Sequence, residues 1–571
     1  MTAAAGRARR VPSLAPALTV ALLLLPVSAG LLGVAAPSLG YMPALGGERL
    51  SALPFRELFA WPGLSRAVAL SVLVGLAATA LSLLAVMLIV AGWRGSRAFR
   101  ALERALSPLL SVPHAAAAFG LAFLIAPSGW ISRALSPWAT GWERPPDLLI
   151  VQDPWGLSLI LGLVAKEVPF LFLMTLAALP QAQPAKSETV ARALGYAPLT
   201  GWFKTVFPRI YRQIRLPVLA VLAYSMSVVD MAIILGPSAP PPLSVQVVRW
   251  MNDPDLALRF RAAAGAMLQL GLVAAALLLW AGLEKAGAAL GRRWVERGGR
   301  GGGAAEGALR LLGLALAALS AGAVFAGLGG LAIWSFAGLW PFPDALPEGP
   351  TLRSWMRHGP ALAAPMAETL LIAAAATALS LFLTIACLET ESRHGLAPSG
   401  RALWLLYLPL IVPQVAFLTG LQTLALAAGL DGGRGAVIAA HALFVLPYVF
   451  LSLAGPWREW DARQALVART LGAGPGRVLF AVRLPMLLRP ALTAAAVGFA
   501  ASVGQYLPTL LIGGGAVRTA TTEAVALAAG GDRRAIAIWS LAQTAAALAP
   551  FLAAALIPRL AWRNRAGLRD G

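Results

Sequence analysis

The sequence predicts an all-α, polytopic membrane protein of about twelve transmembrane helices, arranged as two parallel six-helix repeats. Hydrophobic residues make up 58% of the 571 residues, and the mean hydropathy is +0.74. Charged residues are only 12% of the chain, about half the share found in soluble domains. Apolar runs long enough to cross a bilayer as helices recur throughout the chain. Patterns from the first half also return, in the same order, in the second half.

The apolar runs fall into two sets, separated by a polar, Gly-rich segment. The first set is Leu14–Val34, Ala67–Ala91, Ala105–Ala126, Trp155–Leu179, Leu216–Gly236 and Ala262–Leu283. The second set is Ala308–Phe336, Ala363–Leu388, Ala402–Gly429, Ala436–Gly455, Pro490–Ile512 and Ala535–Ile557. The composition of residues 284–307 is typical of a flexible linker. We therefore expect a first domain over residues 1–283, a linker over 284–307 and a second domain over 308–571.

The first apolar run follows three arginines, Arg7, Arg9 and Arg10. This pattern suits a cleaved signal peptide or a retained span. We favour the retained span, because the second half has a matching first run.

The net charge of +21 comes from Lys and Arg in short loops between the apolar runs. This distribution follows the positive-inside rule and predicts a lipid bilayer, not nucleic acid, as the partner. It also places both termini in the cytoplasm. Cys387 is the only cysteine, which excludes an intrachain disulfide and a Cys-based metal site.

Three short patterns support an internal duplication. In a chain of such biased composition one match would mean little, but their common order indicates two copies of one unit. The first pattern is A-A-T-A-L-S-L, at Ala77–Leu83 and again at Ala375–Leu381. The second is V-P followed by G-L, at Val112, Pro113, Gly120 and Leu121 and again at Val412, Pro413, Gly420 and Leu421. The third is a single proline, Pro169 in the first half and Pro447 in the second.

The most informative repeat is a basic segment, Ala191–Pro208, which aligns without a gap with Ala468–Pro485. Its sequence predicts a helix, a turn and a second helix. We expect Ser187 to cap the first helix of the first copy and Gly195 to end it in a left-handed conformation. Pro198 suits the first turn of the next helix, and Pro208 marks its end or a kink.

These two segments resemble the cytoplasmic signature E-A-A-x3-G-x9-I-x-L-P of permeases in binding-protein-dependent, type I (MetI-like) ATP-binding cassette (ABC) importers. The Gly and the closing Pro are kept as Gly195 and Pro208 and as Gly472 and Pro485. The Glu of the signature falls on Thr189 and Leu466, with Glu188 next to the former, and its Ile falls on Thr205 and Val482. With two such units in one chain, the sequence is most similar to the fused permeases of the ferric-iron and thiamine importer group.

The resemblance implies a permease of the bacterial inner membrane with two kinds of partner. A periplasmic or extracellular binding protein would deliver the substrate, a thiamine-like cation or ferric iron. Two cytoplasmic ATPase subunits would each bind one of the repeated segments, which we call the first and second coupling loops. No phosphate-binding G-x-x-x-x-G-K-[ST] motif is present, so another polypeptide must hydrolyse ATP. The expected coupling residues are Glu188, Ala191, Arg192, Leu194, Gly195, Pro198 and Pro208 in the first loop, and Ala468, Arg469, Leu471, Gly472, Pro475 and Pro485 in the second.

Polar residues inside the apolar runs are candidates for the substrate path, because such residues are costly in a membrane. They are Lys166, Asp230, Gln414 and Gln505. Alternatively, Lys166 and Asp230 pair with each other across two helices and have only a structural role.

The sequence contains no catalytic, cofactor-binding or metal-binding motif, so we predict neither an enzyme nor a cofactor. The main alternative is an ion- or proton-coupled secondary transporter, which would work without an ATPase. An integral membrane enzyme is a weaker alternative.

Overall fold

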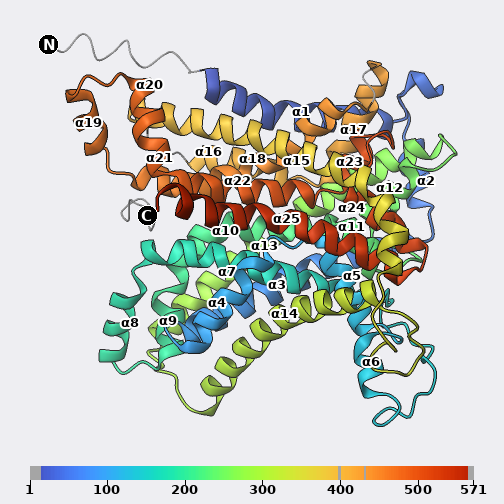
Figure 1. The fold of residues 1–571 in the computed structure, drawn as a ribbon, viewed down its shortest axis with the longest axis horizontal. Coiled ribbons are helices and arrows are strands. Elements are labelled where there is room, and N and C mark those ends of the chain that lie inside the picture. Colours follow the sequence, from blue (N-terminus) through green and yellow to red (C-terminus); the bar gives the residue numbers. More distant parts are fainter. Residues whose placement is uncertain (1–13, 397–399, 430–431, 564–571) are drawn as a thin grey trace.

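The structure, a computed structural model, describes residues 14–396, 400–429 and 432–563. In this part of the chain every extended regular element is a helix (Figure 1), and the only β-type pairs are two isolated bridges. Nine helices in the described ranges are long and apolar enough to span a membrane, or up to eleven if each of two bent pairs is one span. The predicted all-α, polytopic fold class is confirmed.

The helices of the first half are α1 (Leu14–Ser38), α2 (Leu53–Phe59), α3 (Leu64–Trp93), α4 (Arg97–Leu109), α5 (His114–Ile125), α6 (Trp130–Leu135), α7 (Leu157–Ala182), α8 (Pro184–Ala193), α9 (Pro198–Thr205), α10 (Phe207–Ser227), α11 (Asp230–Leu235), α12 (Leu243–Met251) and α13 (Leu258–Glu296). Those of the second half are α14 (Ala304–Phe336), α15 (Arg353–His394), α16 (Gly400–Ile411), α17 (Gln414–Ala427), α18 (Arg434–Glu459), α19 (Arg463–Thr470), α20 (Pro475–Arg477), α21 (Leu484–Met486), α22 (Leu488–Val503), α23 (Leu507–Ile512), α24 (Ala520–Ala526) and α25 (Arg533–Ala561).

Four of the predicted spans are broken helices. The breaks lie between α4 and α5, α10 and α11, α16 and α17, and α22 and α23. The break between α16 and α17 bends the chain by 83°. Pro113 and Pro413 directly precede α5 and α17, and a proline disfavours helix in the residue before it. The breaks occur at corresponding places in the two halves.

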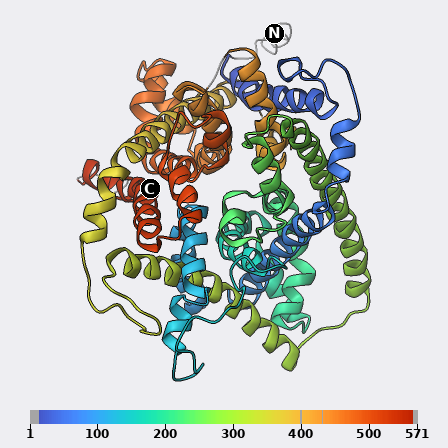
Figure 2. The ribbon, with the colours of Figure 1, turned by 90° about the vertical axis from the view of Figure 1, so that its right-hand side faces the viewer.

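The first helix of each half packs against the other half. α1 contacts α17 and α15, and α14 contacts α3 and α5, as Figure 2 shows from the end of the bundle. Glycines permit the closest crossings: a Cβ on Gly420 would lie 1.9 Å from the carbonyl oxygen of Gly30 in α1. Gly120 and Gly327 make the corresponding crossing of α5 and α14. The glycine of the repeated V-P…G-L pattern therefore serves a contact between the halves.

The segment between the halves is shorter than the predicted linker over 284–307. α13 continues to Glu296 and α14 begins at Ala304, so only residues 297–303 are not helical. The early part of the predicted linker is held as helix, because Glu284 accepts hydrogen bonds from Tyr211 (2.7 Å) and Arg215 (2.8 Å) of α10.

Both coupling loops lie at the same end of the bundle, at the left of Figure 1. α1 begins and α25 ends toward this end, whereas α2, α6 and α12 lie at the opposite end. The helices between the two ends bury the apolar core, which contains residues from both halves.

Candidate functional site

A cavity of about 180 Å³ lies where the four helix breaks meet. Residues Leu110 to Pro113, Val228 and Val229, Val412, and Gly504 to Tyr506 line it. Each of these groups belongs to a different break. Broken helices around an internal cavity are typical of transporters, since unwound backbone is tolerated in a membrane only inside the protein.

All four residues predicted for the substrate path line this cavity: Lys166, Asp230, Gln414 and Gln505. They come from α7, α11, α17 and the break before α23, so the fold brings both halves together at one site. Three tyrosines that the sequence did not indicate as site residues also line the cavity: Tyr224, Tyr448 and Tyr506. The available signal in the sequence was that Tyr506 directly follows Gln505 and that Tyr224 lies six residues before Asp230.

Lys166 does not pair with Asp230, and the alternative of an ion pair between them was wrong. The Lys166 ammonium donates instead to the carbonyl oxygens of Leu109 (2.7 Å) and Val112 (2.6 Å). These carbonyls lie at the end of α4 and in the break that follows it. The break leaves carbonyl groups free to accept further hydrogen bonds, and the buried lysine donates to two of them.

Two carboxylates face the same cavity. Glu167 Oε1 lies 3.9 Å from His114 Nε2, and the His114 ring lies 5.1 Å from the Tyr224 ring. Asp230 is the first residue of α11. Gln505 Oε1 has no hydrogen-bond partner within the described ranges. The cavity therefore offers carboxylates, aromatic rings and an amide oxygen, while the lysine is engaged by the backbone.

The first coupling loop consists of α8, a turn and α9. Gly195 has a φ of 79°, as its predicted left-handed conformation requires, and Pro198 lies in the first turn of α9. α8 begins at Pro184, so the prediction that Ser187 caps it was wrong. Pro208 lies in the first turn of α10. Glu188 pairs with Arg94 at 2.5 Å, so its carboxylate is engaged within the chain.

The second coupling loop repeats this geometry with less burial. Gly472 has a φ of 85°, Pro475 begins α20 and Pro485 lies in the first turn of α21. No residue of α19 is buried, and Leu471 is 82% exposed. Among the remaining predicted residues, Arg192, Leu194 and Arg469 are exposed, Ala468 is half-buried and Ala191 is buried.

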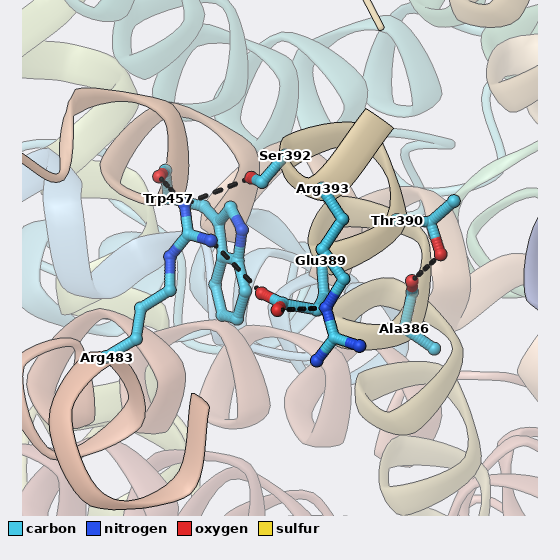
Figure 3. A network of polar contacts seen from close by, with 7 residues as sticks. All are labelled: Ala386, Glu389, Thr390, Ser392, Arg393, Trp457 and Arg483. Atoms are coloured by element: carbon cyan, nitrogen blue, oxygen red, sulfur yellow. Dashed lines mark hydrogen bonds and ion pairs between the residues drawn. The ribbon is translucent and has the colours of Figure 1, made fainter. Parts of the chain in front are cut away.

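Arg483 anchors the base of the second coupling loop (Figure 3). Its guanidinium donates to Glu389 Oε2, Ser392 Oγ and the carbonyl oxygen of Trp457, each at 3.1 Å. It also lies over the rings of Trp457 (4.5 Å) and Trp460 (4.7 Å). Such a planar, multiply bonded cation fixes the loop against α15 and α18.

Broken helices around a cavity, together with paired loops at one end of the bundle, define a membrane transport protein. The chain is 34% identical over 523 residues to the inner membrane ABC transporter permease protein YnjC of Escherichia coli (strain K12), which covers 91% of this chain and 93% of YnjC. The chain therefore belongs to the ABC transporter permeases.

Shorter matches support the same family. The molybdenum transport system permease protein ModB of Mycobacterium tuberculosis (strain ATCC 25618 / H37Rv) is 35% identical over 189 residues, 30% of this chain and 72% of ModB. ModB of Azotobacter vinelandii is 35% identical over 89 residues, 16% of this chain and 39% of that protein. No family model and no solved structure matched the chain.

The chain is thus a transmembrane permease component of an ABC transporter, a multi-pass protein of the inner membrane. The family indicates a transporter rather than an enzyme and implies ATPase and substrate-binding partners. A secondary transporter that works without an ATPase does not fit this family.

Proposed function

We propose that the chain is a two-domain permease of an importer, with residues 1–283 and 308–571 as its two domains. Its central cavity carries the substrate, and its two coupling loops each bind one of two cytoplasmic ATPase subunits. A binding protein outside the membrane delivers the substrate to the end of the bundle opposite the coupling loops. ATP-driven movement of the loops then changes the side from which the cavity is accessible.

The observation that carries this proposal is the convergence of four helix breaks, two from each half, on one cavity. A relative motion of the halves would change the shape of such a cavity directly. The coupling loops lie in both halves at one end of the bundle (Figure 1), where two matching partners can bind side by side.

We infer that the substrate is a small organic cation with an aromatic ring, as the resemblance to thiamine importers suggests. Glu167 and Asp230 supply negative charge, and the rings of Tyr224, Tyr448 and Tyr506 suit a flat cation. Lys166 does not oppose this, because backbone carbonyls hold its ammonium.

Two other substrates fit the cavity less well. Ferric iron requires several converging oxygen ligands, and no group of three His, Cys, Asp or Glu side chains suited to a metal occurs in the described ranges. The ModB relatives are named for molybdenum transport. A negatively charged substrate would be repelled by the two carboxylates here.

The test is uptake by proteoliposomes that contain the permease, its ATPase and its binding protein. Radiolabelled thiamine is the probe cation, with ferric iron and molybdate in parallel. We expect ATP-dependent thiamine uptake that falls at least about tenfold in Asp230→Asn and Glu167→Gln, since a buried charge pair contributes several kcal/mol. Asp255→Asn, at an exposed position, is the control. Uptake of molybdate alone would contradict the cation proposal, and uptake driven by a proton gradient without ATP would contradict the importer proposal.

A further inference from the structure

A glutamate from the second half caps a helix of the first coupling loop. Glu306, in the first turn of α14, accepts hydrogen bonds through Oε1 from the backbone N–H groups of Leu199 (2.5 Å) and Thr200 (3.0 Å). These N–H groups lie in the first turn of α9, where helical donors have no partner within the helix. A carboxylate is also favoured there by the helix dipole. α9 itself supplies no side-chain cap.

The segment between the halves, residues 297–303, adds contacts at both ends of α9. At its start, the Ala197 N–H donates to the Arg300 carbonyl at 2.9 Å. At its end, the Lys204 ammonium donates to the Gly299 carbonyl at 2.7 Å. This ammonium also lies over the rings of Tyr196 (5.0 Å) and Trp294 (4.8 Å). The linker is therefore packed along the coupling loop and does not merely connect the halves.

Gly301 permits this close approach. Its φ is 74°, and a Cβ at this position would lie 2.0 Å from Oγ1 and 2.7 Å from Cβ of Thr200. Any side chain would push the linker away from α9 and would also be strained in the left-handed region. Gly299 differs, since its Cβ would meet nothing within 4 Å and its φ is not in that region.

The second coupling loop has no matching cap in the part of the chain that the structure describes. The residue before α20 is Gly474, without a side-chain hydrogen bond, and α19 has no buried residue. The anchor of this loop, Arg483, lies at its base. The two loops are thus held differently, although their sequences and turns correspond.

We propose that Glu306, with Gly301 and Lys204, positions the first coupling loop and ties it directly to the second half. This inference rests on the proposed function of the loop as an ATPase contact. α14 belongs to the second half but packs on α3 and α5 of the first. A displacement of α9 therefore reaches both halves through α14, whereas the second loop acts through its own half. The two ATPase contacts are functionally unequal.

The experiment compares substituted permeases reconstituted with the ATPase and binding protein. Glu306→Ala removes the acceptor and Glu306→Gln keeps a carbonyl oxygen for the same N–H groups. Gly301→Ala introduces the clash, and Gly299→Ala is its matched control. Glu296→Ala, an exposed glutamate at the end of α13, controls for lost charge. The readouts are substrate transported per ATP hydrolysed, and the distance distribution between spin labels at Val190→Cys and Leu311→Cys in a Cys387→Ser background.

We expect transport per ATP to fall about tenfold in Glu306→Ala, because hydrogen bonds to a charged group contribute enough free energy for such a change. Gly301→Ala should show the same loss, and the label distances should broaden in both variants. Glu306→Gln should show a smaller loss, because it keeps an acceptor without the charge, and Gly299→Ala and Glu296→Ala should stay near wild type. If Glu306→Ala fails to fold, Gly301→Ala still tests whether the linker positions the first coupling loop.

Unchanged transport per ATP in both Glu306→Ala and Gly301→Ala would overturn the positioning role. A fall in transport without broader label distances would overturn it as well, and so would an equal loss in Glu306→Gln. A wild-type permease without ATP-dependent transport would contradict the proposed function. The label distances would still show in that case whether Glu306 holds the loop.

Discussion

Gly120 and Gly327 meet backbone to backbone: a Cβ on either residue would lie 2.8 Å from the carbonyl carbon of the other. Gly120 belongs to α5 and Gly327 to α14, so the contact joins the two halves. Helices in a membrane associate largely through such close packing of small residues, because lipid provides no hydrophobic driving force between them. The crossing of Gly30 and Gly420 repeats the relationship between α1 and α17.

Gly327→Val should weaken the contact between the halves. The new side chain has no room at the crossing, and overpacking of this kind costs about 2 kcal/mol. We expect a lower melting temperature of the detergent-solubilised protein, measured by loss of the monodisperse peak in size-exclusion chromatography after heating. Gly329→Val is the control, because a Cβ at Gly329 meets nothing within 4 Å. Equal melting temperatures for the two variants would show that the crossing contributes little.

Gly195→Val and Gly472→Val should uncouple transport from ATP hydrolysis. Both glycines are in the left-handed region, where a side chain costs about 1–2 kcal/mol, and the strain should change the angle between the loop helices. We expect normal membrane levels and continued ATP hydrolysis, with less substrate transported per ATP. Gly287→Val, within α13 and with open space around it, is the control. Normal uptake by the double variant would remove the coupling role of these turns.

Arg483→Lys should loosen the second coupling loop. A lysine keeps the charge but cannot bond Glu389, Ser392 and the Trp457 carbonyl in one plane between two indole rings. We expect proteolytic cleavage within the loop to become about tenfold faster, in line with the loss of a hydrogen bond to a charged group. Arg477→Lys, at an exposed position of α20, is the control. Equal cleavage rates for wild type and Arg483→Lys would contradict the anchoring role.

Asp153 gives a pH-dependent contribution to stability. Burial raises the pKa of this carboxyl, but hydrogen bonds from the backbone N–H groups of Ser158, Leu157 and Trp155 and from the Ser158 hydroxyl outweigh it and hold the pKa below its ordinary value. The stabilisation is therefore present above the unfolded pKa of about 4 and is lost as the pH falls through the lowered folded pKa.

Asp153→Asn should accordingly lower the melting temperature at pH 7, and this effect should shrink as the pH falls below the unfolded pKa of about 4 and through the lowered folded pKa. The measurement is the difference in melting temperature between the two proteins across this range. Asp147→Asn, at an exposed loop position, is the control. A difference that does not change with pH would show that the charge of Asp153 is not what stabilises the start of α7.

The sequence predicted the fold class, and it indicated four polar residues that prove to line one cavity, because apolar runs and intramembrane polar groups have few physical interpretations. The left-handed conformation of Gly195 and Gly472 was also predictable, since a glycine with a proline three residues later is typical of one helix ending and the next beginning. The helix breaks were missed because hydropathy does not change across Val228–Val229. The partner of Lys166 was also missed, since the carbonyls that it bonds became available only through the break after α4.

The interdomain linker shows a different limit. Its glycines and charges are typical of a flexible connector, and the sequence alone predicts one. The contact of Gly301 with Thr200 and the bonds of Glu306 depend on α14 lying against the first half. That arrangement is a property of the assembled molecule, so no local pattern records it.

The packing of α1 against α17 and α15 has a consequence for biosynthesis. α1 is synthesised before α15 and α17, but the surfaces that cover Gly30 and Thr19 belong to residues near Gly420 and Cys387. A ribosome must translate most of the chain before these surfaces exist. α1 therefore remains in the lipid without these neighbours during this interval, and the permease matures only when α15 and α17 pack against it.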